Sequence, residues 1–249
     1  MFRGVYAVTV LNTQFSILFP KIINIKRNIM EREETLLKEF MPCQIFPIPD
    51  DAPMELPRVS VFTKNNHSNL SISMSGCTLN TQYDDNFNRD WPKCEHYLKG
   101  KSSLIYDVIE GLSPDSIYFQ GFVAQILWDK TEGDPMYFLK DKITKLDIKG
   151  HFHDLSCKFT LIKDDKYFVN LSLIGIKAAD PAIMGIAPVP DAMCQNKLLI
   201  NIDINDRRRF NEEPGYNSTK ETTRELLSVL STVIRDKLGL LLTEGGIEL

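Results

Sequence analysis

Two histidines separated by a single residue are the strongest indication of a metal site in this chain. His151 and His153, followed by Asp154, form an H-x-H-D stretch directly before a predicted strand. Because residues i and i+2 of a strand point to the same side, both imidazoles could reach one metal ion. A third ligand has to come from elsewhere, and residues 94–96 (Cys-Glu-His) are the only cluster that offers one. The competing interpretation is a polar strand start with two exposed imidazoles.

Three consecutive arginines form a second candidate site, for an anion. Arg207, Arg208 and Arg209 follow the end of a predicted strand, where their guanidinium groups could clamp a phosphate or a carboxylate. Four carboxylates flank them in the sequence: Asp203, Asp206, Glu212 and Glu213. Local neutralisation of the arginines is therefore the simpler interpretation. The alternative is a metal- or phosphate-site enzyme that uses the histidine pair and the arginines.

The short motifs of several large enzyme classes do not occur. The sequence has no G-x-x-x-x-G-K-S/T, G-x-G-x-x-G, G-x-S-x-G or H-E-x-x-H. Hydrolysis of nucleoside triphosphates by a P-loop and α/β-hydrolase chemistry are therefore not expected. No catalytic residue and no cofactor follow from the sequence, and the balance is against an enzyme.

Charge and cysteine content limit the classes of partner and the cellular compartments that we expect for this protein. The chain of 249 residues has a formal net charge of −4 with both signs scattered along it, whereas dedicated nucleic-acid binders carry a basic surplus. Its five cysteines include no C-x-x-C pair, which predicts reduced thiols in a cytoplasmic protein. Polar residues such as Arg3, Asn12 and Gln14 interrupt the apolar N-terminus, so we expect a strand there and no membrane span.

The element that must position the histidines is a predicted hairpin. Apolar residues alternate with polar ones from Leu155 to Leu161 and again from Tyr167 to Leu173. Residues 164–166 (Asp-Asp-Lys) form a polar break between the two arms. Period-two alternation on both sides of a short turn indicates antiparallel strands that lie on a core.

The order of the remaining elements indicates the fold class. Strands come in runs, and long helices follow them, which is typical of α+β proteins with antiparallel sheet. The sequence predicts antiparallel sheet packed against long helices, either as two similar halves, residues 1–114 and 115–249, or as one continuous domain. The predicted strands cover residues 5–19, 58–63, 70–74, 116–129 and 197–205, and the predicted helices cover residues 26–41, 90–110 and 219–240.

Two further stretches are relevant to binding. Five prolines between residues 42 and 57 exclude a helix and indicate a stiff extended connection docked on the surface, with a proline-rich ligand for a partner domain as the alternative. The aromatic residues Tyr118, Phe119 and Phe122 are expected to pack in the core, although they could instead line a groove.

Several short motifs together resemble a sporadically distributed family of uncharacterised bacterial proteins of about this length. A proline-bearing link runs into a strand at residues 55–59 (ELPRV), and a second strand runs into an Asn-containing turn over residues 70–80. Trp91 and Tyr97 anchor a helix, and a strand at residues 200–203 (INID) precedes the last amphipathic helix. The resemblance implies a soluble bacterial α+β protein. The family has no established activity, so no catalytic residue can be transferred.

These observations favour a non-enzymatic binding or assembly module of the bacterial cytosol. Large antiparallel sheets with exposed edges favour self-association, such as a homodimer, or the addition of a partner's strand. A sporadic distribution also fits a role in phage conflict or in mobile elements. The strand and helix order suggests SecB-like binding of unfolded clients as a further alternative. Within the chain, the irregular residues 178–195 are the expected partner site.

Overall fold

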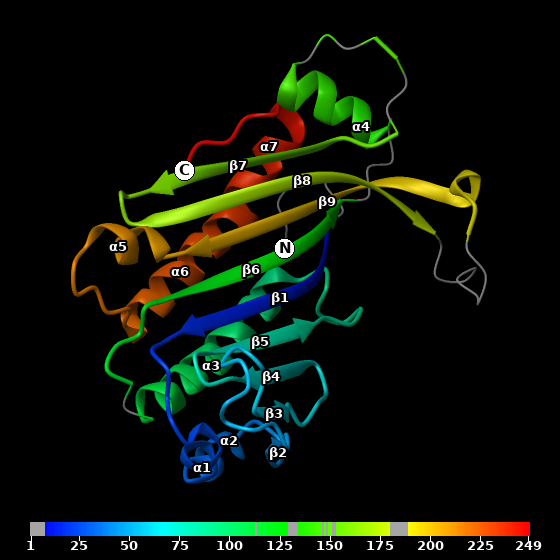
Figure 1. The fold of residues 1–249 in the computed structure, drawn as a ribbon. Helices are drawn as coiled ribbons and strands as arrows, with labels where there is room; N and C mark the ends of the chain where they lie inside the picture. Colours follow the sequence, from blue (N-terminus) through cyan, green and yellow to red (C-terminus); the bar gives the residue numbers. More distant parts are fainter. Residues whose placement is uncertain are drawn as a thin grey trace.

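Nine strands form one sheet in the computed structural model (Figure 1). The structure describes residues 8–112, 114–128, 134–145, 147, 149–150, 153–179 and 189–249. All strand pairs are antiparallel, in the order β2-β3-β4-β5-β1-β6-β9-β8-β7. The strands are β1 (Val8–Leu18), β2 (Gln44–Ile45), β3 (Val59–Phe62), β4 (Ser68–Ile72), β5 (Gly76–Gln82), β6 (Phe119–Trp128), β7 (Ser156–Lys163), β8 (Tyr167–Ala179) and β9 (Cys194–Asn205).

The two halves of the chain repeat one order of elements. In the first half β1 is followed by a crossover, the meander β3-β4-β5 and the long helix α3 (Trp91–Glu110). In the second half β6 is followed by a crossover, the meander β7-β8-β9 and the helix α6 (Lys220–Thr232). The first strands of the halves pair with each other, from Val8↔Trp128 to Leu18↔Phe119. The two halves therefore share one continuous sheet.

Helices cover one face of this sheet (Figure 1). The predicted helix start at Asp90 is confirmed, because its side chain accepts a hydrogen bond from the Lys93 backbone N–H. A capping box between Thr219 and Thr222 starts α6. The shorter helices are α1 (Ile25–Met30), α2 (Glu33–Leu36), α4 (Pro135–Phe138), α5 (Arg207–Glu212) and α7 (Leu238–Glu244), and π-helical turns cover Leu139–Thr144 and Val233–Lys237.

The core lies between the sheet and the helices. Alternate residues of the central strands are buried on the helical face, and the rings of Phe15 in β1 and Phe122 in β6 stack there with centroids 4.6 Å apart. Across the helical layer, the Trp91 indole N–H donates to Ser231 Oγ at 3.2 Å, which ties the start of α3 to the end of α6. The opposite face carries both polar and apolar side chains, and there the Asn12 amide donates to Gln125 Oε1 at 2.6 Å. The fold class α+β is thus confirmed.

The predicted hairpin is present, but its two strands differ in burial. β7 and β8 pair in register from Ser156↔Ile174 to Lys163↔Tyr167. β8 lies inside the sheet and buries one face, whereas β7 is an edge strand whose inward residues are only half-buried. Core formation therefore depends on β8 more than on β7.

The structure departs from the predicted elements in at least two places. The predicted helix over residues 26–41 is broken at Arg32 into α1 and α2. β5 was not predicted, because only alternate residues of its polar sequence GCTLNTQ are buried. In β6, a Cβ at Gly121 would lie 2.9 Å from Asn205 Cβ, so this glycine permits close approach of β9. A register shift between β1 and β6 lies between Val10 and Asn12.

Candidate functional site

The structure does not assemble the predicted histidine site within its described residues. His153 is exposed in the loop before β7, and His151 lies outside the described residues. Among the residues that the structure does describe, no group of three or more His, Cys, Asp and Glu side chains could hold a metal ion. The metal pair therefore stays a prediction from the sequence.

The three arginines diverge from one another and engage side chains of their own chain. Arg207 lies over the Phe119 ring, 5.6 Å from its centroid. Arg208 contacts the carboxylates of Asp165 (2.7 Å) and Glu212 (3.0 Å). Arg209 forms a bidentate pair with Glu213, at 2.8 and 2.9 Å, and lies 4.5 Å from the Tyr216 ring centroid. Binding of an external anion at Arg208 or Arg209 would require these ion pairs to open.

A buried carboxylate fixes the corner that carries the arginines. Asp206, which precedes α5, is fully buried, and its Oδ1 accepts the Gln120 backbone N–H at 2.7 Å. Its Oδ2 accepts the Tyr216 hydroxyl at 2.6 Å and the Ser218 hydroxyl. The Gln120 side chain continues the network by donating to Ser218 Oγ and accepting from Thr223 Oγ. The Asp206 carboxylate joins strand β6 to the loop after α5, and the Gln120 side chain extends the network to helix α6.

The structural role of Asp206 was not predicted, because its place in the sequence indicated only a neutralising charge for the arginines. The available signal was its position. Asp206 follows the clean alternation of β9 directly, where an exposed turn residue is normally expected. Whether such a residue turns inward depends on Gln120 in β6, which is distant in sequence, and on Tyr216 and Ser218 in the loop after α5. The pattern along the chain alone could not show this.

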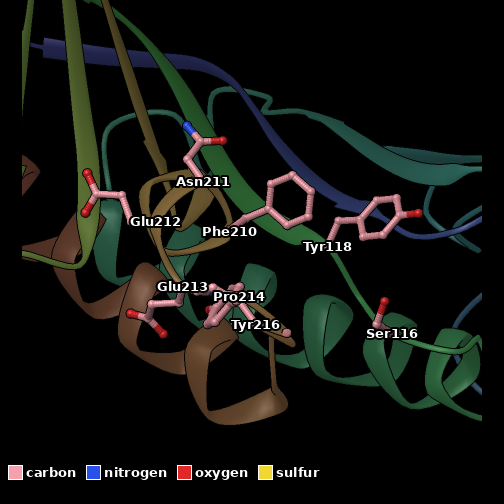
Figure 2. Close-up of a pocket in the computed structure, with 9 residues that line it drawn as sticks. Ser116, Tyr118, Phe210, Asn211, Glu212, Glu213, Pro214 and Tyr216 are labelled. Atoms are coloured by element: carbon pink, nitrogen blue, oxygen red, sulfur yellow. The ribbon is translucent and has the colours of Figure 1, made fainter.

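A pocket of about 310 Å³ lies on the outer side of this corner (Figure 2). The rings of Tyr118 and Phe210 form one side, with centroids 5.2 Å apart, and Glu213, Pro214 and Tyr216 form the other. Tyr118 and Phe210 are 36% and 37% exposed. The expectation of core packing is thus confirmed for the fully buried Phe122 but wrong for Tyr118, which lies in the loop before β6.

The protonation states around this pocket do not resemble those of an acid–base site. Burial and the nearby Asp206 carboxylate raise the pKa of the Tyr216 phenol to about 12, so it remains protonated at neutral pH. Arg209 lowers the pKa of Glu213, which keeps that carboxylate ionised. Away from the pocket, burial raises the pKa of the Cys43 thiol to about 11 and that of the Cys94 thiol to about 12. The arrangement can stack and hydrogen-bond a ligand, but these groups do not titrate near pH 7.

A second feature lies at the other end of the sheet, in the proline-rich connection. Arg58, at the start of β3, has no exposed surface. Its guanidinium donates to four backbone carbonyls of the preceding segment, at 2.9–3.3 Å: those of Pro49, Ala52, Pro53 and Leu56. The segment is thereby folded around one side chain, and we call it the Arg58 loop (residues 44–58). As predicted, residues 42–57 form no helix, but the connection turns around Arg58 and is not extended along its whole length.

The Arg58 loop carries exposed apolar side chains. Ile45 is 46% exposed, Phe46 37%, Met54 42% and Leu56 42%. The Phe46 backbone N–H donates to the Arg58 carbonyl, and the Met54 carbonyl accepts from the Met74 backbone N–H. The backbone at Phe46 and Met54 is therefore held by hydrogen bonds. We call these four side chains the Arg58 loop surface. Rigid exposed apolar groups are typical of protein-binding surfaces.

Comparison with protein-family models and with curated proteins finds no match. No helix in the described ranges is both long enough and apolar enough to cross a membrane. Of residues 178–195, where a partner site was expected, 180–188 lie outside the described residues. The proposed function therefore rests on the geometry of the surfaces described above.

Proposed function

We propose that this chain is a non-enzymatic binding or assembly module that uses the Arg58 loop surface to contact a protein partner. One observation carries the proposal. Ten of the sixteen large apolar side chains that are exposed in the described part of the chain come from the connection between β1 and β3 and its two ends. They are Leu18, Ile23, Met30, Leu37, Met41, Ile45, Phe46, Met54, Leu56 and Phe62.

Such a concentration is not needed for folding. Exposed apolar residues scattered singly are normal, but a group of them on one connection favours an interaction site. The connection is held by hydrogen bonds and ion pairs rather than by burial of these side chains. Lys26 Nζ donates to the Ile48 carbonyl, and Lys101 pairs with Glu39. A surface that is ordered before binding loses little entropy when a partner docks.

The first partner to test is a second copy of the chain. We expect wild-type protein at tens of micromolar to exceed the monomer mass in multi-angle light scattering, and the double variant Phe46→Ser/Leu56→Ser to return to the monomer mass. Leu240→Ser is the matched control, because Leu240 is 40% exposed but lies in α7, away from the loop. Wild-type protein that is monomeric at these concentrations would exclude self-association.

Binding of unfolded clients is the second candidate, and a specific observation favours it. Met30, Met41 and Met54 are among the exposed side chains of the connection. Methionine is flexible and polarisable, and it is over-represented on surfaces that accept varied partners. If a monomeric wild type delays the aggregation of an unfolded model protein and Phe46→Ser/Leu56→Ser does not, the surface serves clients. If the wild type neither self-associates nor delays the aggregation of the unfolded protein, the proposed function is wrong.

A further inference from the structure

A groove of about 820 Å³ lies between helices α3 and α6, on the outer side of the helical layer. The helices run in opposite directions, because Trp91 at the start of α3 contacts Ser231, while the hydroxyl of Tyr106 near its end donates to the Ser218 carbonyl. Small side chains along the seam leave the groove open. It is lined by Glu95, His96, Lys99, Gly100, Ser102, Ser103, Lys220, Thr223, Arg224, Leu227 and Ser228.

The groove lining holds more Lys and Arg side chains than carboxylates, in a protein whose net charge is negative. Its lining includes Lys99, Lys220, Arg224 and His96, with Glu95 as the single carboxylate. Two of the cations are positioned by ion pairs at the rim. Lys220 contacts both oxygens of Asp107, at 2.6 and 2.7 Å, and Arg224 contacts Glu221 at 2.6 Å. In contrast, the Lys99 ammonium group has neither a hydrogen bond nor an ion pair within the described structure.

Gly100 lies in the lining of the groove, within helix α3. A glycine inside a helix weakens it, so a structural reason is normally expected. A Cβ at Gly100 would meet nothing within 4 Å, so the packing of this chain does not require a glycine there. What the residue provides is space at the groove, where a ligand can approach the α3 backbone closely.

We propose that the α3–α6 groove binds a small ligand bearing phosphate groups. Lys99 supplies positive charge from α3, and Arg224 supplies it from α6 once its ion pair with Glu221 opens. Ser103 and Ser228 supply hydroxyl donors. A volume of about 820 Å³ suits a small molecule, and cations on both sides suit a ligand with two phosphates. This site lies outside the Arg58 loop and is independent of the protein-binding function proposed above.

Calorimetric titration of the full-length protein with pyrophosphate tests whether Lys99 and Arg224 contribute to phosphate binding. We expect saturable binding that weakens with added salt, and a loss of about tenfold in affinity for Lys99→Ala and for Arg224→Ala, the size of one charge-assisted hydrogen bond. Lys21→Ala is the control, because Lys21 is exposed and does not line the groove. Absent binding, or equal affinity in all variants, would overturn the proposal. If the protein bound poly-glutamate but not pyrophosphate, the proposal would also be overturned, and the groove would be a site for an acidic protein segment.

Substitution of Gly100 tests the shape of the groove. We expect Gly100→Ala to raise the melting temperature, because alanine favours helix, and at the same time to weaken pyrophosphate binding severalfold. Gly239→Ala in α7 is matched, since a Cβ there also meets nothing within 4 Å; it should raise stability and leave binding unchanged. Wild-type affinity in Gly100→Ala would contradict the site. Phe46→Ser/Leu56→Ser should bind pyrophosphate like wild type, so failure of one proposal leaves the other standing.

Discussion

Replacing Arg58 by methionine is expected to lower the free energy of unfolding by about 3 kcal/mol, which is large for one substitution. Methionine retains much of the apolar stem but donates no hydrogen bond. The carbonyls of Pro49, Ala52, Pro53 and Leu56 would lose the guanidinium donor. Those of Pro49 and Pro53 keep the backbone N–H groups of Ala52 and Leu56, so only the carbonyls of Ala52 and Leu56 lose their one donor among the described residues. A carbonyl that loses its partner costs on the order of 1–3 kcal/mol, and hydration of the loop offsets part of that cost. Urea unfolding followed by tryptophan fluorescence measures the change.

The reason that this loop needs an arginine lies in its composition. Proline has no backbone N–H, so a segment rich in proline has more carbonyl acceptors than donors. A guanidinium group offers five N–H donors in a planar fork, whereas the lysine ammonium offers three at one point. Arg58→Lys should therefore recover only part of the lost stability. Both Arg58 variants should also weaken binding through the Arg58 loop surface, because its four side chains would no longer be held in place.

The control for Arg58 is another arginine in a different environment. Arg27 pairs with Glu31 across one helical turn and its side chain is 81% exposed. An exposed pair of this kind contributes a few tenths of a kcal/mol, so Arg27→Met should change stability by less than about 0.5 kcal/mol. If Arg58→Met were equally mild, the guanidinium would not be what folds the loop.

The sequence predicted the fold class and most long elements because their patterns are local. Alternation over residues 197–205 and helical spacing over residues 90–110 each depend on neighbours within a few positions, and both are confirmed as β9 and α3. The predicted hairpin turn at residues 164–166 is confirmed for the same reason. Where local signals were weak, as in β5, the strand forms because β1 and β4 pair with it on both sides. The residues that determine this pairing are spread over distant parts of the chain.

The candidate sites were less predictable because each depends on distant contacts. Arg58 was visible only as part of a short motif, and its burial depends on the path of the loop around it. The α3–α6 groove needs two helices separated by more than a hundred residues. The arginines at residues 207–209 were correctly expected near carboxylates, and Arg208 and Arg209 pair with Glu212 and Glu213. The additional partner Asp165 comes from the turn of the distant hairpin.

Replacing Asp206 by asparagine is expected to lower the free energy of unfolding by about 2 kcal/mol at neutral pH. The carboxylate accepts from Gln120 on one oxygen and from Tyr216 and Ser218 on the other. Asparagine keeps one acceptor oxygen and replaces the other by an NH₂ group, which faces a donor. The hydroxyls of Tyr216 and Ser218 can rotate, but the backbone N–H of Gln120 cannot. Urea unfolding at pH 7 gives the difference directly.

The pH dependence of the same variant provides a second measurement. Burial raises the pKa of Asp206 in the folded protein above its value in the unfolded chain. Between the two pKa values the folded state binds more protons, so this group makes the wild type more stable as the pH falls. Asp206→Asn lacks this titration. The stability gap between wild type and variant should therefore widen on acidification from pH 7 towards pH 4.

Asp115→Asn is the control for Asp206, because Asp115 lies in the loop before the same end of β6 and is exposed. The free energy of unfolding of Asp115→Asn should match that of the wild type to within about 0.5 kcal/mol, and this difference should not change with pH. A gap for Asp206→Asn that narrowed on acidification would mean that hydrogen bonds from Tyr216, Ser218 and Gln120 outweigh burial. The folded-state pKa would then be lowered, and Asp206 would stabilise the corner as a carboxylate at every pH above its unfolded value.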